Sequence, residues 1–204
     1  MTLAVWAADE QWEEAIDLSN EIEWQRMNAP HESIPAADGY FILDTAAGNA
    51  FSFSVTDKPV LIHAVTETLQ SMQAPPNVVR INTWKGFLKN ECWEVAGNIS
   101  SQCSEILSAC HRKYINVPDT PGLVAPRVIS MIINEAFFAL GEKVSTKKEI
   151  DIAMKLGTSY PYGPFEWGDT IGLKNIYQLL LTLSITDKRY SPAPLLQKEA
   201  HTWP

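Results

Sequence analysis

The stretch that decides the fold of this chain opens with Asp119-Thr120-Pro121-Gly122 and closes with Tyr160-Pro161-Tyr162-Gly163-Pro164-Phe165-Glu166-Trp167. Pro121-Gly122 predicts a turn, and the residues after it follow a helical period. A first helix is expected to run to Gly141, which stands where a C-cap belongs. Asn134 falls mostly outside its apolar face, which comprises Ile129, Ile132, Ile133, Ala136, Phe137 and Leu140.

More helices are predicted on both sides of the closing stretch. Thr146 followed by Glu149 is a capping box, so a second helix should start there and end at Gly157. A third helix is expected after Trp167 and a short fourth at Leu195. The second helix should bury Ile150, Ala153, Met154 and Leu156, and the third should contain Ile171, Ile176, Leu179, Leu180 and Leu183. The closing stretch contains four aromatic residues, Tyr160, Tyr162, Phe165 and Trp167. We interpret them as rings that pack against each other within a loop, rather than as a surface on which a base or an acyl chain stacks.

The order of these pieces resembles the C-terminal domain of the 3-hydroxyacyl-CoA dehydrogenase family. The resemblance covers about the last 86 residues, and it implies an all-helical domain over 119–204 that carries most of the homodimer contact in the family. We therefore expect a homodimer through the apolar face of the Arg127–Leu140 helix and through the helix after Trp167. Besides the two quoted stretches, the resemblance rests on Asn134-Glu135-Ala136, Glu149–Gly157, Asp169-Thr170-Ile171-Gly172-Leu173 and Arg189–Leu196.

Composition and charge exclude several classes of protein. The 204 residues are 46% hydrophobic and 20% charged, typical of a globular chain, and no apolar run reaches the roughly 18 residues of a membrane span. The N-terminus does not resemble a signal peptide, and Cys92, Cys103 and Cys110 have no metal-binding spacing. These features predict idle thiols, no metal and a cytoplasmic location. Through Asp57 there are eleven acidic residues and one basic residue, which argues against nucleic acid and anionic membranes as partners.

The first 118 residues predict a shortened, Rossmann-like α/β domain. Apolar strand candidates alternate with helical or turn segments, although there is room for fewer strands or crossover helices than the family has. The expected strands are Leu3–Trp6, Ile22–Met27, Tyr40–Asp44, Val60–Ile62, two within Val78–Ala96, and Tyr114–Pro118, with helices near Trp12–Leu18 and Ser100–Arg112.

The turn after the first strand does not match a dinucleotide fingerprint. In the family this turn carries glycines that let the backbone reach the pyrophosphate of NAD. Here it reads Ala7-Ala8-Asp9-Glu10-Gln11-Trp12-Glu13-Glu14, and no glycine occurs before Gly39. The carboxylates at this helix start would repel a pyrophosphate. We expect no cofactor, and NAD only if the protein is active.

The resemblance also places the catalytic pair of the family, a His and a Glu twelve residues later. Glu94 falls at the glutamate position, and Asn82 falls where the His belongs, so the general base is absent. Asn82 and Lys85 are candidates for substrate binding, although Lys85 is more typical of a surface lysine and Glu94 of a structural carboxylate. His63 is interpreted as structural, but a base supplied across a dimer by His63 or His111 stays open. A family Asn that helps to hold substrate is replaced by Pro126.

Three functions compete at this point. The first is a degenerate relative of the dehydrogenases that has lost NAD-dependent hydride transfer and keeps a pocket for an acyl thioester or another small ligand. The second is an active NAD-dependent 3-hydroxyacyl-CoA, or 3-hydroxybutyryl-CoA, dehydrogenase with altered motifs. The third is a structural or regulatory dimer module in fatty-acid metabolism, in which Trp84 and Trp93 would fill the pocket beside Glu94.

Overall fold

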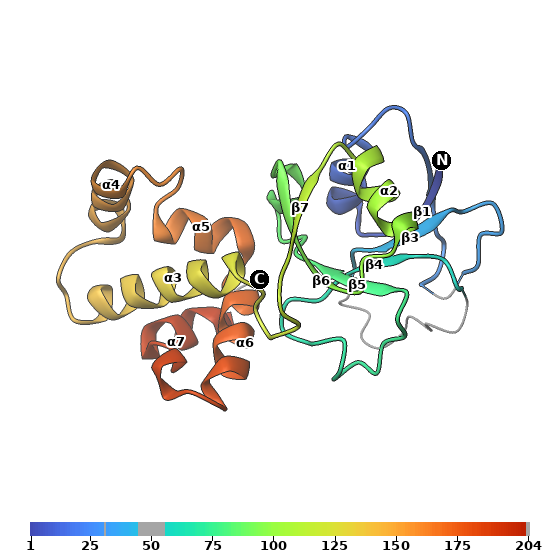
Figure 1. Cartoon of the computed structure of the whole chain (residues 1–204). Helices are drawn as coiled ribbons and strands as arrows, with labels where there is room; N and C mark the ends of the chain where they lie inside the picture. The colour runs from blue at the N-terminus through green and yellow to red at the C-terminus, as the bar shows by residue number, and fades with distance from the viewer. Residues whose placement is uncertain (31, 45–55, 203–204) are drawn as a thin grey trace. The chain divides into compact units, whose positions relative to one another are not determined.

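The chain forms two compact units, Met1–Leu123 and Val124–Pro204 (Figure 1). The computed structural model describes residues 1–30, 32–44 and 56–202. Residues 119–123, which the sequence analysis assigned to the helical part, join the first unit. Asp119 accepts hydrogen bonds from the Leu69 and Gln70 backbone, and Gly122 N donates to Val65 O at 2.7 Å.

The first unit is built on a seven-stranded sheet in the order β2-β1-β3-β4-β5-β6-β7. The first five strands of this order are mutually parallel, β6 runs antiparallel to β5, and β7 is parallel to β6. The strands are β1 (Thr2–Trp6), β2 (Glu23–Arg26), β3 (Gly39–Ile42), β4 (Val60–His63), β5 (Val78–Ile81), β6 (Cys92–Gly97) and β7 (Lys113–Asn116). Every predicted strand is present, which confirms the α/β fold class.

The two faces of this sheet are covered by different kinds of structure. Central strands such as β3 and β5 are buried along their whole length, so their sequences are apolar runs rather than alternating patterns. Helices α1 (Asp9–Ile16) and α2 (Ser101–Ala109) pack on one face, together with the short 3-10 helix η2 (Phe87–Lys89). That core includes Leu3, Val5, Phe41, Leu61, Val79, Ile81, Trp93, Val95, Ile106 and Leu107.

The other face of the sheet is covered by irregular chain. Apolar side chains from the connections before β3 and before β5, including Met27 and Leu69, pack on Tyr40, Ile42 and Val60. The described parts of 27–38 and 64–77 contain no helix, although parallel strands are usually joined through one. The shortened first unit therefore keeps its sheet, with helix α1 between β1 and β2 and irregular chain in the described parts of the connections before β3 and before β5.

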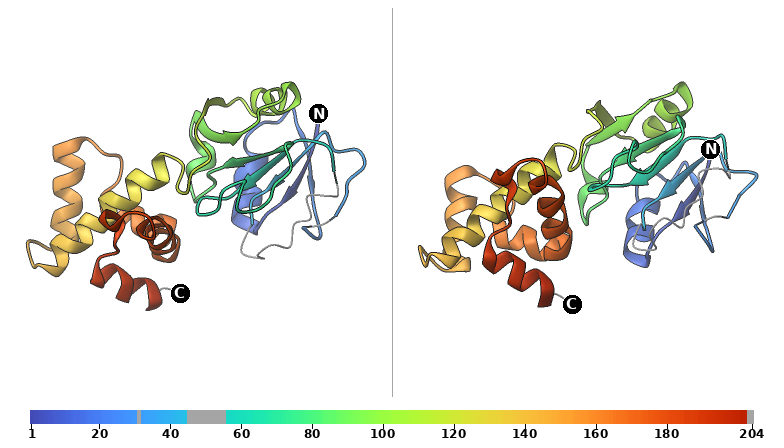
Figure 2. Two further views of the ribbon diagram at one scale, coloured as in Figure 1. Left: turned by 60° about the horizontal axis from the view of Figure 1, so that its bottom comes forward. Right: turned by 90° about the horizontal axis from the view of Figure 1, so that it is seen from below.

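The second unit is all helical. Helix α3 runs along its middle, with α5 on one side and α6 and α7 on the other (Figures 1 and 2). Its helices are α3 (Ala125–Gly141), α4 (Lys147–Thr158), α5 (Pro164–Ile171), α6 (Leu173–Ser184), η3 (Lys188–Tyr190) and α7 (Pro194–Thr202). The capping box is present, since Thr146 Oγ1 accepts from Glu149 N at 3.3 Å and the Glu149 carboxylate accepts from Thr146 N at 3.2 Å. The single predicted helix after Trp167 is in fact two, because the chain turns at Gly172, where φ is 91°.

Helix α3 ends at Gly141 as predicted, with Glu142 as its C-cap. Helix α4 runs one residue past the predicted stop at Gly157, to Thr158, and its C-cap Ser159 is in a left-handed conformation. One predicted face is wrong. On α4, Ala153 and Leu156 are exposed, Leu156 by 82%. Helix α4 packs mainly against α5, and Lys147 at its start forms an ion pair with Glu199 of α7, but Ile152 and Leu156 stay exposed.

Asn134 was expected mostly outside the buried face of α3, but it is only 2% exposed. Its Nδ2 donates to Ser191 O at 3.0 Å, and its Oδ1 accepts from Ala193 N at 2.7 Å. The Asn134 amide thus hydrogen-bonds two backbone groups of the connection before α7 and holds that connection against α3. Because both ends of the amide have partners, this polar residue can be buried.

The junction of α4 and α5 depends on one carboxylate and one glycine. Asp151 is buried in α4, and its Oδ1 accepts from Phe165 N at 2.9 Å in the first turn of α5. A Cβ atom on Gly163 would overlap the Asp151 carboxyl group. Burial raises the pKa of Asp151 above its ordinary value, although the hydrogen bond from Phe165 opposes this shift.

Two alanine substitutions test this junction. Gly163→Ala should lower the free energy of unfolding by about 1–3 kcal/mol, because the new methyl group forces Asp151 away from α5. Gly157→Ala is the matched control: nothing lies within 4 Å of its added Cβ, so it should be neutral or stabilise the protein by up to about 1 kcal/mol. Denaturant titrations followed by far-UV circular dichroism measure both, and equal effects would contradict the assigned role of Gly163.

Candidate functional site

The candidate site is the edge of the first unit where the parallel strands β1, β3, β4 and β5 have their carboxyl ends. In open α/β sheets, ligands bind outside this edge. Trp6, His63 and Asn82 all lie at or just after the ends of these strands, and the sheet register connects them, with Trp6 beside Ile42 and His63 beside Ile81.

Two of the residues singled out from the sequence belong to adjacent segments at this edge: Glu94 lies in β6, and Asn82 directly follows β5. Strand β5 pairs antiparallel with β6, and Ile81 lies opposite Val95. If that register continued by one residue, Asn82 would lie opposite Glu94, at the Cβ separation of about 4.5–5.5 Å that opposed residues have. Both side chains would then leave the sheet on the face away from α1 and α2, because the intervening Ile81 and Val95 belong to the helix-covered core.

The Asn82 amide has a fixed orientation. Its Oδ1 accepts a hydrogen bond from Trp84 N at 3.0 Å, and the residue is only 9% exposed. Within the described part of the chain, Nδ2 is buried and has no hydrogen-bond partner, and the same holds for Oγ1 of Thr83. Such groups are uncommon in folded proteins, since an unsatisfied buried donor costs about 1–3 kcal/mol.

His63 has no catalytic arrangement in this unit. Its Nδ1 accepts a hydrogen bond from Thr83 N at 3.0 Å, and burial, followed by the nearby charge of Arg80, lowers its pKa to about 4. His63 is therefore neutral at physiological pH and holds the backbone after β5. Its side chain leaves β4 on the same face as Leu61, which is the face covered by the helices. The other candidate, His111, has its Nε2 3.5 Å from Ser19 Oγ.

Lys85 is an exposed residue that pairs with the start of α1. Its Nζ lies 3.1 Å from a carboxylate oxygen of Glu10, and the next backbone N–H, that of Gly86, donates to Glu14 at 3.3 Å. Asp9 forms a further ion pair with Arg26 at 2.5 Å. The first turns of α1 thus hold carboxylates that bind neighbouring protein groups, in the place where a dinucleotide fold would present bare N–H groups to a pyrophosphate. These residues do not fit NAD in that mode.

Pro126 occupies the first turn of α3 and is buried. Proline is favoured there because the missing N–H would have no helical partner anyway. Among the described residues, no three His, Cys, Asp or Glu side chains are grouped closely enough to hold a metal ion. No helix in the described ranges has the length and apolarity needed to cross a membrane.

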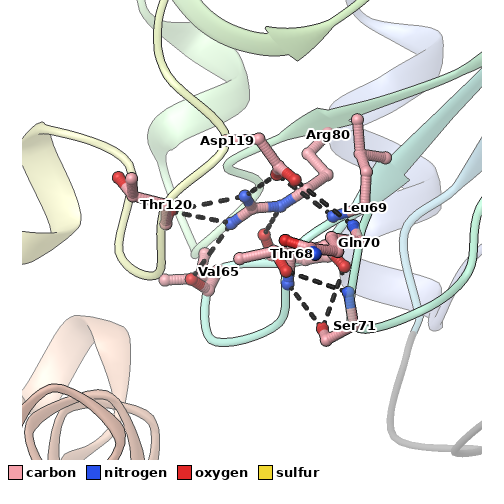
Figure 3. Close-up of polar contacts among 9 residues, drawn as sticks. Val65, Thr68, Leu69, Gln70, Ser71, Arg80, Asp119 and Thr120 are labelled. Carbon is pink, nitrogen blue, oxygen red and sulfur yellow. Dashed lines mark hydrogen bonds and ion pairs between the residues drawn. The ribbon is translucent and has the colours of Figure 1, made fainter. Parts of the chain in front are cut away.

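The strongest polar network of the first unit surrounds Arg80, to which the sequence analysis gave no role (Figure 3). Its side chain is completely buried, and Nη1 forms an ion pair with Asp119 Oδ1 at 2.5 Å. Nε donates to Ala64 O at 2.9 Å, and the remaining N–H groups reach the carbonyls of Val65 and Thr120 at 3.4 Å. The sequence could have revealed this role, because Arg80 is the single cation in the apolar strand Val78–Ile81 and a buried charge requires a partner.

Asp119 extends this network to the backbone of the connection between β4 and β5. Its two oxygens accept from Leu69 N at 3.1 Å and Gln70 N at 3.3 Å, so one carboxylate joins the β4–β5 connection, the sheet and the segment before α3 (Figure 3). Partial burial raises the pKa of Asp119, but the hydrogen bond from Arg80 and those from the two backbone N–H groups outweigh it, and the pKa lies below its ordinary value.

This combination of a mostly parallel sheet and a helical unit is the fold of a class of two-domain dehydrogenases. The structure of (S)-3-hydroxybutyryl-CoA dehydrogenase from Ralstonia eutropha matches with a TM-score of 0.74 over 98% of this chain and 93% of that chain, at 16% sequence identity. A 3-hydroxybutyryl-CoA dehydrogenase from Escherichia coli K12 matches with a TM-score of 0.61 and 31% identity, over 72% of this chain and 32% of that one.

Sequence comparison gives the family. Residues 122–202 match the C-terminal domain of 3-hydroxyacyl-CoA dehydrogenase. The chain is 42% identical over 91 residues to 3-hydroxyadipyl-CoA dehydrogenase of Escherichia coli K12, covering 44% of this chain and 19% of that protein. It is 31% identical over 143 residues to 3-hydroxybutyryl-CoA dehydrogenase of Clostridioides difficile, covering 66% and 51%. The chain belongs to the 3-hydroxyacyl-CoA dehydrogenase family, and it spans about half or less of the length of these curated relatives.

Removing the charge of Asp119 tests the Arg80 network. Asp119→Asn should destabilise the first unit by about 2–4 kcal/mol at pH 7, because a buried guanidinium loses its counter-charge. Since the pKa of Asp119 is lowered on folding, its contribution is present above the ordinary pKa of an aspartate and is lost as the pH falls through the folded-state value. The difference between wild type and variant should therefore shrink in acid.

The control for this variant is Asp9→Asn, which breaks an ion pair whose Asp9 side chain is 87% exposed. Exposed pairs contribute little, so this change should stay within about 0.5 kcal/mol. Denaturant titrations from pH 7 down to about pH 3, followed by tryptophan fluorescence, measure both variants. An Asp119→Asn effect as small as that of the control would show that Arg80 does not depend on this carboxylate.

Proposed function

We propose that this protein is a relative of the 3-hydroxyacyl-CoA dehydrogenases that binds an acyl thioester or another small ligand and does not transfer hydride to NAD. The observation that carries the proposal is Asn82 itself, which stands twelve residues before Glu94, where the family has its His. In the family arrangement a His takes the proton from the substrate hydroxyl as hydride leaves, and a Glu orients it. An amide cannot take up a proton at neutral pH, so Asn82 cannot act as that base.

The start of α1 supports the same proposal. Glu10 and Glu14 bind Lys85 and the Gly86 backbone, and Asp9 binds Arg26. A pyrophosphate placed on this helix start would have to displace these pairs and then meet the released carboxylates. Two effects therefore oppose pyrophosphate binding: the carboxylates repel it, and the N-terminus of α1 is no longer available as an anion site.

The two alternatives make different demands on the same residues. An active NAD-dependent dehydrogenase is favoured by the names of the relatives, and it requires a base from outside the Asn82–Glu94 pair. A purely structural module requires a filled pocket beside Glu94. Trp93 does not serve that purpose, because it packs in the helix-covered core near Phe41 and donates to Leu88 O at 3.2 Å. Trp84 is buried beside Phe87.

A titration with NADH separates these functions. With acetoacetyl-CoA present, we expect no saturable quenching of the seven tryptophans by NADH up to about 1 mM, a limit that corresponds to roughly −4 kcal/mol, and no oxidation of NADH. Acetoacetyl-CoA alone should bind. Asn82→His should restore the family residue without restoring NADH oxidation, because the α1 carboxylates remain. Turnover by the wild-type protein would overturn the proposal, and failure to bind any acyl-CoA would leave the structural module.

We further propose that the chain forms a homodimer through its second unit. A hollow of about 610 Å³ with a mostly apolar lining opens between α3 and α4, where Val128, Met131 and Met154 line it. In contrast, the apolar residues predicted on the helix after Trp167 are already used inside the unit, since Ile176, Leu179, Leu180 and Leu183 are buried. An apolar hollow beside a weakly packed helix favours a second copy of the same surface as its cover.

Sedimentation of two lysine variants tests the dimer. Met154→Lys places a charge in the hollow and should shift the dimer towards monomer by about tenfold or more in dissociation constant. Ile185→Lys is the control, because Ile185 follows α6 outside the hollow and is 80% exposed. A wild-type protein that sediments as a monomer at micromolar concentration would contradict the proposal, as would equal effects of the two variants.

A further inference from the structure

The last strand of the sheet, β7, has an open edge. Within the described residues it pairs with β6 on one side and with no strand on the other, and all four of its residues are exposed. Its two large apolar side chains, Tyr114 and Ile115, are 38% and 50% exposed. An edge of this kind presents backbone groups that can pair with a strand of another chain.

The hydrogen bonds on the β6 side show which backbone groups of β7 point outward. The N–H groups of Lys113 and Val117 both donate to carbonyls on the β6 side, at 2.9 Å. Successive residues of a strand present their backbone groups to opposite sides, so Ile115 also faces β6. The N–H and C=O groups of Tyr114 and Asn116 therefore face the open edge.

A second copy of β7 matches these groups in one antiparallel register. With Ile115 on the two-fold axis, Tyr114 of one copy lies opposite Asn116 of the other, and the outward groups of both residues find partners. Centring the pair on Asn116 would instead place Tyr114 opposite Pro118, which has no N–H to donate. Centring it on Tyr114 would place Asn116 opposite Arg112, whose N–H already donates within its own chain at 3.1 Å.

The charges agree with this register. Lys113 of one copy would lie opposite Val117 of the other, so the two lysines stand about 14 Å apart along the strands, beyond the Debye length of about 10 Å at 0.1 M salt. The strand at the other edge, β2, lies in the acidic part of the chain, which has eleven acidic residues and one basic residue through Asp57. Two copies of that edge would repel each other.

We propose that β7 is a surface for self-association, at which two copies of this chain join their sheets by antiparallel pairing centred on Ile115. This surface goes beyond the proposed function, because it includes neither the turn at Asn82 nor the hollow of the second unit. A pair of four-residue strands is smaller than a standard interface of about 800 Å² per partner, so the association is weak and reversible.

Disulfide cross-linking tests the register. The background is Cys92→Ser, because Cys92 is exposed whereas Cys103 and Cys110 are buried. Ile115→Cys places two thiols on the two-fold axis, with Cα atoms about 4.5 Å apart, and mild oxidation should give a covalent dimer on non-reducing gels. Tyr114→Cys is the control one residue away, because the register sets its two copies more than about 7 Å apart, too far for a disulfide.

A proline at position 116 tests the hydrogen bonds. Combined with Ile115→Cys, Asn116→Pro removes the N–H that faces the open edge and keeps the bonds to β6, so it should slow cross-linking about tenfold or more. Asn116→Ala keeps this N–H and should cross-link as fast as the protein with Asn116. Near-UV circular dichroism of each variant verifies that the fold is intact.

Three results would overturn this proposal. They are the absence of a cross-link through Ile115→Cys, equal cross-linking through Tyr114→Cys, and equal effects of Asn116→Pro and Asn116→Ala. Each of these results would leave the proposed function standing, because that function is tested by ligand binding and by the second unit.

Discussion

A single buried cation constrains the architecture of the first unit. Arg80 lies on a central strand with its side chain completely buried, and a guanidinium in that position must find a counter-charge and acceptors for its N–H groups. Asp119 supplies the charge, and the carbonyls of Ala64 and Val65 supply acceptors. The connection after β4 and the segment before α3 are therefore held against the sheet, although they contain no regular structure.

The same constraint affects the candidate site two residues further along the strand. Arg80 lies on β5 and Asn82 directly follows it, and burial, followed by the charge of Arg80, lowers the pKa of His63 and keeps it neutral. A neutral His63 can accept the Thr83 N–H, which fixes the turn that orients Asn82. The hydrogen bond from Thr83 N to His63 and the one from Trp84 N to Asn82 thus fix the turn at the carboxyl edge of the sheet.

In the second unit, some residues of the apolar pattern remain exposed in the single chain. Helices α3, α5, α6 and α7 bury their apolar residues against each other, whereas α4 is attached through Asp151 and the first turn of α5. Leu156 and Ile152 consequently stay exposed, and Ile150 and Met154 line an open hollow. A helix with this much free apolar surface is stabilised when another surface covers it.

The sequence by itself determined the elements. Apolar runs predicted the strands and a capping box predicted the start of α4, because each of these depends on neighbouring residues or on a fixed spacing. The sequence also shows Asn82, and no histidine, twelve residues before Glu94. Only the tertiary structure decided which partners these elements find. Arg80 and Asp119 are distant in sequence, and Asn134 binds the backbone of Ser191 and Ala193. Helix α4 packs mainly against α5, which leaves part of its apolar face exposed. Local sequence determines where helices and strands form. The partner of a buried charge, a buried amide or an apolar face comes from a distant segment, which only the folded chain brings close.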